Sequence, residues 1–296
     1  MGEIVGAGLL AHVPTIVLPD DLRRELNNGK ESTLYTGLHA LRREVFDELK
    51  PDVVLVFDSH WFTTVEFVVT AHEHRRGHYT SDELPRGMSS VPYDFPGSPE
   101  LAHLIAKVAD DTPECWITAI DNEHLPLAYA TLNFLPFLQA QEKWMSVSVC
   151  QTAEQFDFAT VGRVVGEAIA QSDLRVALIA SGAVSHTFHK LRDLRSHEAA
   201  DEKHIFSQEA REWDHRVIDA LLEGDHAQVL AEMDGFLTVK PEGRFGHYQM
   251  MAAALGGPQC TAPGRLFSDY ENSIGTGQVH IWFDQPSRGW TGEKQQ

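Results

Sequence analysis

Short, continuous apolar runs alternate with longer amphipathic stretches along most of the chain. Several of the runs are apolar throughout, which is typical of strands that are covered on both faces of a sheet. The stretches between them carry apolar residues at helical spacing, as at Leu38, Leu41, Val45 and Leu49. The runs predict strands over residues 4–10, 53–57, 66–71, 115–120, 145–150, 176–180 and 279–283. The amphipathic stretches predict helices over residues 38–49, 161–169, 199–222 and 247–255.

Strands and helices that alternate in this way predict an α/β fold with a mixed, mostly parallel central sheet flanked by helices. No internal repeat or clear boundary interrupts the pattern, so we expect a single catalytic domain over residues 1–290 and a flexible tail over 291–296. The longest irregular stretch covers residues 80–99 and is rich in proline and glycine. A loop of that length in a compact domain is often part of a binding site.

A histidine follows three of the predicted strands. His12 comes after the run 4–10, and His60 comes after the run 53–57. His186 follows the run 176–180 by way of a Ser-Gly turn. In open α/β sheets, ligands bind in the crevice outside the carboxyl ends of the strands. Three histidines at that edge therefore suggest a metal centre or an acid–base centre.

Composition and charge narrow the class of partner. The chain has 296 residues and a net charge of −19 with histidine counted as neutral; such a surface repels phosphate backbones, so we expect no nucleic-acid partner. An anionic small molecule stays compatible, because a few arginines can reverse the potential inside a pocket. No apolar run approaches the roughly 18 residues that span a bilayer, so we expect no membrane partner. The three cysteines form no CxxC motif, which favours a reducing compartment and predicts a cytoplasmic protein.

His12 and His60 are candidate metal ligands, because each offers an imidazole at an equivalent strand end. Asp58 and Ser59, beside His60, could orient its ring as hydrogen-bond acceptors. A third ligand is needed, and Glu242 is the carboxylate that the pattern favours, in a Pro-Glu-Gly turn just before a predicted helix. Two histidines and one carboxylate form a facial triad, which leaves open positions for oxygen and substrate on ferrous iron.

Further histidines leave two roles open. His247 lies close to Glu242 in sequence and is the rival third ligand, although its place at the predicted start of a helix is an ordinary one. His186 could project into the same crevice as a neutral side chain that accepts a proton and returns it later. His189 is the nearby alternative for that acid–base role.

Taken in order, these residues resemble the class III, or LigB-type, extradiol ring-cleaving dioxygenases. Within that family the chain is most similar to the 3,4-dihydroxyphenylacetate (homoprotocatechuate) 2,3-dioxygenase branch. The matching segments cover residues 12–14, 56–61, 79–85, 180–186, 242–243 and 275–279. No single segment is decisive, but the ordered set spreads over nearly the whole chain.

The resemblance implies Fe(II), with Mn(II) as the alternative, held by His12, His60 and Glu242. It implies His186 as the acid–base residue beside the metal. Tyr129 would stand where many family members carry an additional active-site histidine.

Some substrate-binding positions stay open under the resemblance. His124 could take the place of Tyr129 if the loop is shifted, and Arg244 or Arg192 could pair with a substrate carboxylate. The implied reaction is extradiol cleavage of a substituted catechol, such as 3,4-dihydroxyphenylacetate, with O2 to a muconic semialdehyde in aromatic catabolism. The family also implies a homo-oligomer. The rival interpretations are a zinc-dependent hydrolase on the same ligands and a non-enzymatic, Memo-like relative.

Overall fold

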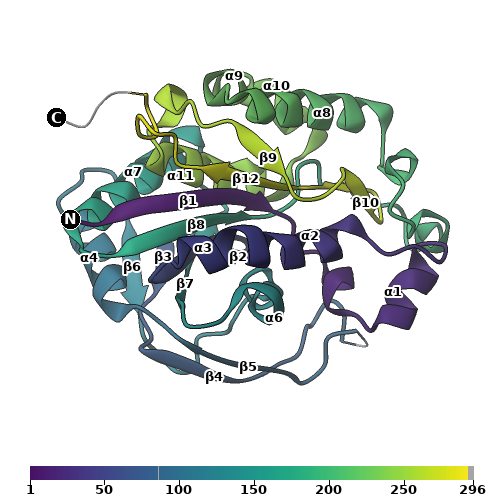
Figure 1. Ribbon diagram of the computed structural model, residues 1–296, viewed down its shortest axis with the longest axis horizontal. Coiled ribbons are helices and arrows are strands. Elements are labelled where there is room, and N and C mark those ends of the chain that lie inside the picture. The colour runs from purple at the N-terminus through teal and green to yellow at the C-terminus, as the bar shows by residue number, and fades with distance from the viewer. Residues whose placement is uncertain (86, 293–296) are drawn as a thin grey trace.

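The computed structural model describes residues 1–85 and 87–292, and a large twisted sheet forms the centre of this part of the chain (Figure 1). The sheet has eight strands there, in the order β6-β3-β7-β2-β8-β1-β12-β9. Their bounds are β1 (Glu3–Leu10), β2 (Val53–Thr63), β3 (Phe67–Thr70), β6 (Ile117–Ile120), β7 (Lys143–Cys150), β8 (Arg175–Ser181), β9 (Gly264–Leu266) and β12 (His280–Asp284).

The middle of the sheet is parallel and its margins are mixed. Strands β7, β2, β8 and β1 run side by side in one direction. Strand β12 runs antiparallel to β1 and to β9, and β3 pairs antiparallel with β7 but parallel with β6. The predicted α/β class with a mixed, mostly parallel sheet is confirmed. The carboxyl ends of β1, β2 and β8 therefore meet at one edge.

Alternate residues of the central strands feed two separate hydrophobic cores. In β2, Val53, Leu55 and Phe57 pack in one core, whereas Val54 and Val56 pack in the other. Because both faces are covered, neither face of the strand needs polar residues, which explains the continuous apolar runs.

Helices cover both faces of the sheet (Figure 1). Those of the first core are α4 (Pro99–Asp110), α7 (Gln155–Gln171), α8 (Gln208–Glu223), α9 (His226–Ala231), α10 (Met233–Phe236) and α11 (Gly246–Ala254). Those of the second core are α2 (Thr33–Leu41), α5 (Tyr129–Leu132) and α6 (Leu135–Leu138), with η2 (Arg42–Phe46) and α3 (Asp47–Leu49) continuing α2.

Shorter elements surround this frame. They are α1 (Asp20–Leu26), β4 (His74–Tyr79), β5 (Val91–Pro96), β10 (Glu271–Ser273), β11 (Thr276–Gln278), and the 3-10 helices η1 (Pro14–Val17), η3 (Leu194–His197), η4 (Glu202–His204), η5 (Leu237–Val239), η6 (Glu242–Phe245) and η7 (Gly257–Gln259). No helix among the described residues is long and apolar enough to cross a membrane. Of the predicted tail, residues 291 and 292 are described, and residues 293–296 lie outside the described part.

Two predicted segments differ from the structure. The helix expected over residues 199–222 begins later, at Gln208, because the Ser207 side chain accepts a hydrogen bond from the backbone of Ala210 and starts the helix there. The stretch 80–99 is not wholly irregular, since it contains β5, which pairs antiparallel with β4. Neither strand of that hairpin has a continuous apolar run, and β5 carries prolines at Pro92 and Pro96.

Candidate metal centre

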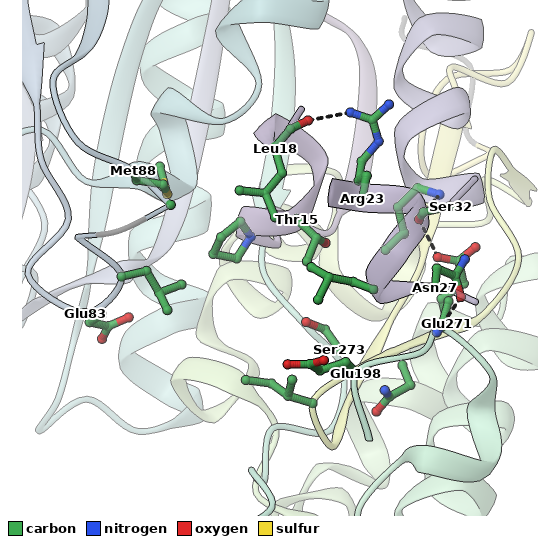
Figure 2. A pocket seen from close by; sticks show the side chains of 18 of the residues that line it. Thr15, Leu18, Arg23, Asn27, Ser32, Glu83, Met88, Glu198, Glu271 and Ser273 are labelled. Atoms are coloured by element: carbon green, nitrogen blue, oxygen red, sulfur yellow. Dashed lines mark hydrogen bonds between the residues drawn. The ribbon is translucent and has the colours of Figure 1, made fainter. Parts of the chain in front are cut away.

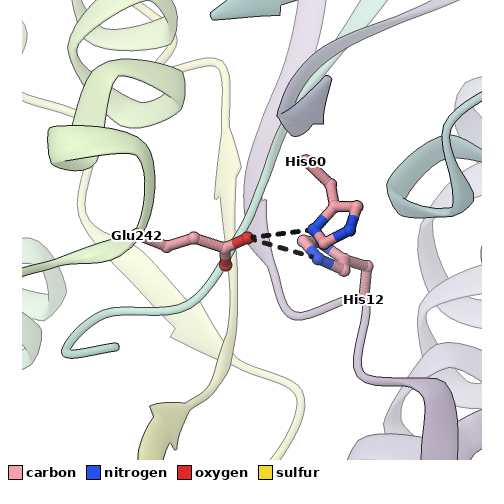
Figure 3. A group of neighbouring side chains, drawn as sticks. All are labelled: His12, His60 and Glu242. Carbon is pink, nitrogen blue, oxygen red and sulfur yellow. Dashed lines mark ion pairs between the residues drawn. The ribbon is translucent and has the colours of Figure 1, made fainter. Parts of the chain in front are cut away.

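Three side chains from distant parts of the chain meet at the carboxyl edge of the sheet (Figure 3). His12 Nε2 lies 3.5 Å from Glu242 Oε1, and His60 Nδ1 lies 3.9 Å from the same oxygen. One ligand atom from each of the three residues lies within 4.8 Å of the other two. Figure 3 shows both imidazoles directed toward the carboxylate from the opposite wall of the crevice.

His12 is held in one orientation by a buried serine. The residue follows β1, and its Nδ1 lies 3.0 Å from Ser181 Oγ at the end of β8. Ser181 Oγ also donates a hydrogen bond to the carbonyl of Ala130, so it is free to accept one from His12 Nδ1–H. Burial lowers the pKa of His12 to about 4, against the opposing effect of Glu242. The imidazole is therefore neutral, and its Nε2 lone pair faces Glu242.

His60 is aimed into the crevice by a bulge in β2. The strand continues beyond the predicted end, but its register with β7 shifts between Asp58 and Phe62. Asp58 Oδ1 accepts hydrogen bonds from the backbone N–H groups of His60 and Trp61, 3.0 Å each, and so holds the bulge. The expectation that Asp58 orients the ring of His60 is thus corrected, because Asp58 bonds the backbone of His60 and Trp61 and the hydroxyl of Thr131, and not the imidazole. The buried Ser59 hydroxyl likewise has no hydrogen-bond partner in the described structure.

Glu242 is fixed by backbone groups that come after β8. Its own N–H bonds the carbonyl of Val184, and its Oε2 accepts a hydrogen bond from Ala183 N at 2.7 Å. The other oxygen, Oε1, is left to face the two histidines. Burial alone would raise the pKa of Glu242, but His12 and His186 outweigh it and hold that pKa well below its ordinary value. The side chain is therefore a buried carboxylate.

This donor set suits a divalent transition metal. Two imidazoles and one carboxylate bring their ligand atoms close together, and this is the donor set that binds non-haem Fe(II) with open positions remaining. Burial lowers the pKa of His60, but Glu242 and Glu83 outweigh it and raise the value, so a cation between these groups would replace a proton. No other group of three such side chains was found among the described residues.

A cavity of about 240 Å³, which we call the metal cavity, lies beside the candidate ligands and is lined by His12, Glu242, Tyr129 and His186 among others. His186 Nε2 lies 4.0 Å from Glu242 Oε2. Its backbone N–H bonds the carbonyl of Lys240, which joins the segment after β8 to the segment that carries Glu242.

Tyr129 lies against the two histidine ligands at the start of α5. Its ring centroid is 4.0 Å from that of His60 and 5.4 Å from that of His12. Its hydroxyl donates a hydrogen bond to Glu83 Oε2 at 3.3 Å. Burial, helped by the charges of Glu83 and Glu242, raises the pKa of Tyr129, so the phenol stays protonated and remains a donor.

Comparison with known proteins agrees with this geometry. Residues 6–283 match the family model described as the catalytic LigB subunit of aromatic ring-opening dioxygenase. The chain belongs to the LigB family. It is 29% identical to a 3,4-dihydroxyphenylacetate 2,3-dioxygenase of Escherichia coli over 230 residues, which cover 76% of this chain and 79% of the relative.

Two further relatives extend the comparison over almost the full length. A 2-aminophenol 1,6-dioxygenase beta subunit from a Pseudomonas species is 24% identical over 294 residues, covering 95% of this chain and 93% of the relative. The crystal structure of an uncharacterised protein from Escherichia coli K12 superposes with a TM-score of 0.63 at 18% identity, covering 94% of this chain and 99% of that one. The last likeness establishes the fold alone. The first two relatives are a dioxygenase and a dioxygenase subunit by name, and the matching family model is described as an aromatic ring-opening dioxygenase.

Some residues that the sequence offered as substrate-binding or acid–base candidates lie outside the metal cavity of this LigB-family chain. His124 has 85% of its side chain exposed, and the Arg244 and Arg192 side chains are exposed too. None of the three lines the metal cavity. His189 instead stacks on His197, with ring centroids 3.6 Å apart, and bonds the carbonyl of His204.

His247 does not belong to the ligand group. It is fully buried in the first turn of α11, and burial lowers its pKa to about 3. Both of its ring nitrogens lack a hydrogen-bond partner in the described structure.

Two residues that contribute to the candidate metal centre have no clear signal in the sequence. In the sequence, Ser181 is recognisable only as part of a Ser-Gly turn. In the structure, its hydroxyl forms a hydrogen bond with His12 Nδ1. Glu83 comes from the irregular stretch after β4, and its Oε2 lies 3.3 Å from His60 Nε2. The proline- and glycine-rich composition indicates a binding loop in that stretch, but nothing in it singles out Glu83.

Proposed function

We propose that this chain is a non-haem Fe(II)-dependent extradiol dioxygenase, which cleaves the ring of a substituted catechol with O2 to a muconic semialdehyde. The observation that carries the proposal is the convergence of His12, His60 and Glu242 beside a cavity that is lined by His12, Glu242 and His186. Membership of the LigB family and the names of its relatives support the same reaction class. Such chemistry requires a metal that has open coordination positions and lies inside a closed pocket.

Bound Fe(II) would supply a single centre for the catechol diol and for O2, which brings both reactants together. The protein's part is to bind and orient. Ser181 keeps the Nδ1 proton of His12 in place, and Ala183 N–H keeps Glu242 pointing inward. Both ligands are thus fixed before substrate arrives, which lowers the cost of organising the site.

His186 is proposed to move the protons. It is the one imidazole of the metal cavity outside the ligand group that lies near Glu242, with its Nε2 directed toward the carboxylate. A neutral His186 Nε2 can accept a proton from a catechol hydroxyl and return it when the ring opens. Tyr129 keeps its proton and can donate its one hydrogen bond to an oxygen of the substrate in place of Glu83.

The proposal is tested by anaerobic loading with Fe(II), followed by oxygen uptake on catechol, 3,4-dihydroxyphenylacetate, 4-alkylcatechols and 2-aminophenol. We expect uptake and a yellow product with at least one of the ring diols. A parallel sample loaded with Zn(II) should consume no oxygen, because zinc is redox-silent. Absence of uptake across the whole panel would refute the proposal. Hydrolytic activity of the zinc form would then favour the hydrolase alternative.

A further inference from the structure

A second cavity, which we call the side cavity, adjoins the metal cavity (Figure 2). Its volume is about 450 Å³, compared with about 240 Å³ for the metal cavity. The two cavities share the lining residues Pro14, Glu83, Leu84, Ser273 and Ile274. Because the two cavities share these residues, a ring held at the metal ligands would lie next to the side cavity.

The walls of the side cavity are mainly aliphatic. Leu18, Leu26 and Leu34 come from the segments around α1 and α2. Leu84 and Met88 come from the loop after β4, and Ile274 comes from the turn between β10 and β11. Surfaces of this kind gain from contact with an apolar group, because both surfaces then leave water.

Two polar side chains of the cavity lining, Glu271 and Asn27, already accept hydrogen bonds from the chain. Glu271 accepts hydrogen bonds from Ser32 Oγ at 2.5 Å and from the N–H and hydroxyl of Thr33 at 2.6 Å each. Asn27 Oδ1 accepts a hydrogen bond from Ala200 N. These groups hold the surrounding segments together, and their partners are already within the chain.

Arg23 is the one cationic side chain among the described residues that line the side cavity. Its guanidinium donates to both oxygens of Glu31, at 2.7 and 2.9 Å, and to the carbonyl of Leu18 at 2.6 Å. It also donates to Asp20 and lies 3.5 Å from the ring centroid of Tyr35. Figure 2 shows the Arg23 head group directed toward Leu18.

Among the lining residues that the structure describes, the charge balance is consequently unfavourable for an anion. Two carboxylates already offset the one arginine. Three glutamates, Glu83, Glu198 and Glu271, complete the charged lining. A substrate carboxylate buried here would lose its water and meet further negative charge.

We propose that the side cavity selects a catechol whose ring substituent is apolar and uncharged, an alkyl or aryl group, over one whose substituent carries a carboxylate. This inference rests on the proposed ring-cleaving function and goes beyond it by naming the substrate class. It separates this chain from the Escherichia coli relative, whose name specifies an arylacetate substrate.

The test compares 4-isobutylcatechol with 3,4-dihydroxyphenylacetate, which have equal numbers of heavy atoms and differ in the charge of the side chain. Dissociation constants are measured by anaerobic titration calorimetry on the Fe(II)-loaded protein, and kcat/KM by oxygen uptake. We expect the isobutyl compound to be favoured at least about tenfold in both. In the series from catechol to 4-propylcatechol, kcat/KM should rise about fourfold per methylene.

Leu84 allows the selectivity to be reversed, because it lines both cavities and is 44% exposed, so a polar replacement is compatible with folding. Leu84→Lys should lower the ratio of isobutyl to acid affinity by about tenfold or more, whereas the matched control Leu84→Met should leave it unchanged. Arg86, which lies outside the described residues, is replaced by Gln in a separate arm, where the ratio should also stay unchanged.

The possible failures are distinguishable. Equal or tighter binding of the acid would overturn the inference, as would an acid preference that Arg86→Gln abolishes. No oxygen uptake with any compound would refute the proposed function. The anaerobic dissociation constants would still decide whether the cavity prefers the apolar substituent.

Discussion

Ser181 offers a test of how the protein prepares His12 to bind a metal. The residue is fully buried at the end of β8, and its hydroxyl lies between the carbonyl of Ala130, at 2.8 Å, and His12 Nδ1, at 3.0 Å. Because the hydroxyl donates to the carbonyl, it accepts a hydrogen bond from His12 Nδ1–H, and His12 Nε2 therefore carries no proton. Ser181→Ala removes this restraint on the tautomer and on the ring orientation.

Ser181→Ala is expected to weaken two measurable quantities, the affinity for the metal and the unfolding free energy of the metal-free protein. Removing a partner that orients a metal-bound histidine typically weakens metal binding roughly 10- to 100-fold, which corresponds to about 1.4–2.8 kcal/mol. The metal-free protein should also lose about 1–3 kcal/mol of unfolding free energy, because Ala130 O and His12 Nδ1 are left buried without this partner. The first effect is specific to the site, and the second is a general consequence of the lost hydroxyl.

A second buried serine separates the two effects. Ser148 lies on β7, which is separated from β8 by β2, and its hydroxyl accepts a hydrogen bond from Val68 N at 2.9 Å. Ser148→Ala should destabilise the metal-free protein similarly but leave the metal affinity unchanged. Competition titrations with a chelator give the dissociation constants, and urea unfolding gives the stabilities. The reasoning is wrong if Ser181→Ala binds Fe(II) as tightly as Ser148→Ala.

Three further variants test the proton-handling and buried groups. His186→Phe should keep its iron and bind catechol yet turn over roughly 10²–10⁴-fold slower, and a near-native rate across pH 6 to 9 would remove His186 from the mechanism. Tyr129→Phe should retain iron and lose roughly tenfold in kcat, measured by oxygen uptake, because one hydrogen bond to a charged group is lost. Burial raises the pKa of Asp214 from 3.8 to about 6, so between these pH values the folded chain keeps a proton that the unfolded chain has released. Stability therefore falls by up to about 3 kcal/mol as the pH rises from about 4 to 6, and urea unfolding of the metal-free Asp214→Asn variant should lack this fall.

The sequence was sufficient for the parallel middle of the sheet because the signals there are local, whereas the short edge strand β9 was not predicted. The runs that became β1, β2 and β8 are apolar throughout, and burial on both faces requires that composition. The parallel arrangement then brings the residues after β1 and the residues after β8 to one edge of the sheet. His12 and His186 were for that reason correctly expected at a common crevice.

Other features depend on contacts that no local pattern contains. The bulge that aims His60 is held by the Asp58 carboxylate, whose other oxygen accepts a hydrogen bond from Thr131, far along the chain. Glu242 points inward because Ala183 N–H bonds it, a contact that only the folded chain creates. The hairpin of β4 and β5 is stabilised by pairing between two polar segments, so it gave no periodic signal.

The central claim is that His12, His60 and Glu242 together bind one metal ion, and the iron content of a glutamate pair tests it most directly. Glu242→Gln keeps the size of the ligand side chain but removes its charge, whereas Glu83→Gln makes the same change at a carboxylate that contacts His60 from the other side, outside the ligand group. After anaerobic loading and removal of free metal, we expect one Fe(II) per chain in the native protein and in Glu83→Gln, and little in Glu242→Gln. Full iron occupancy in a folded Glu242→Gln variant would contradict the account.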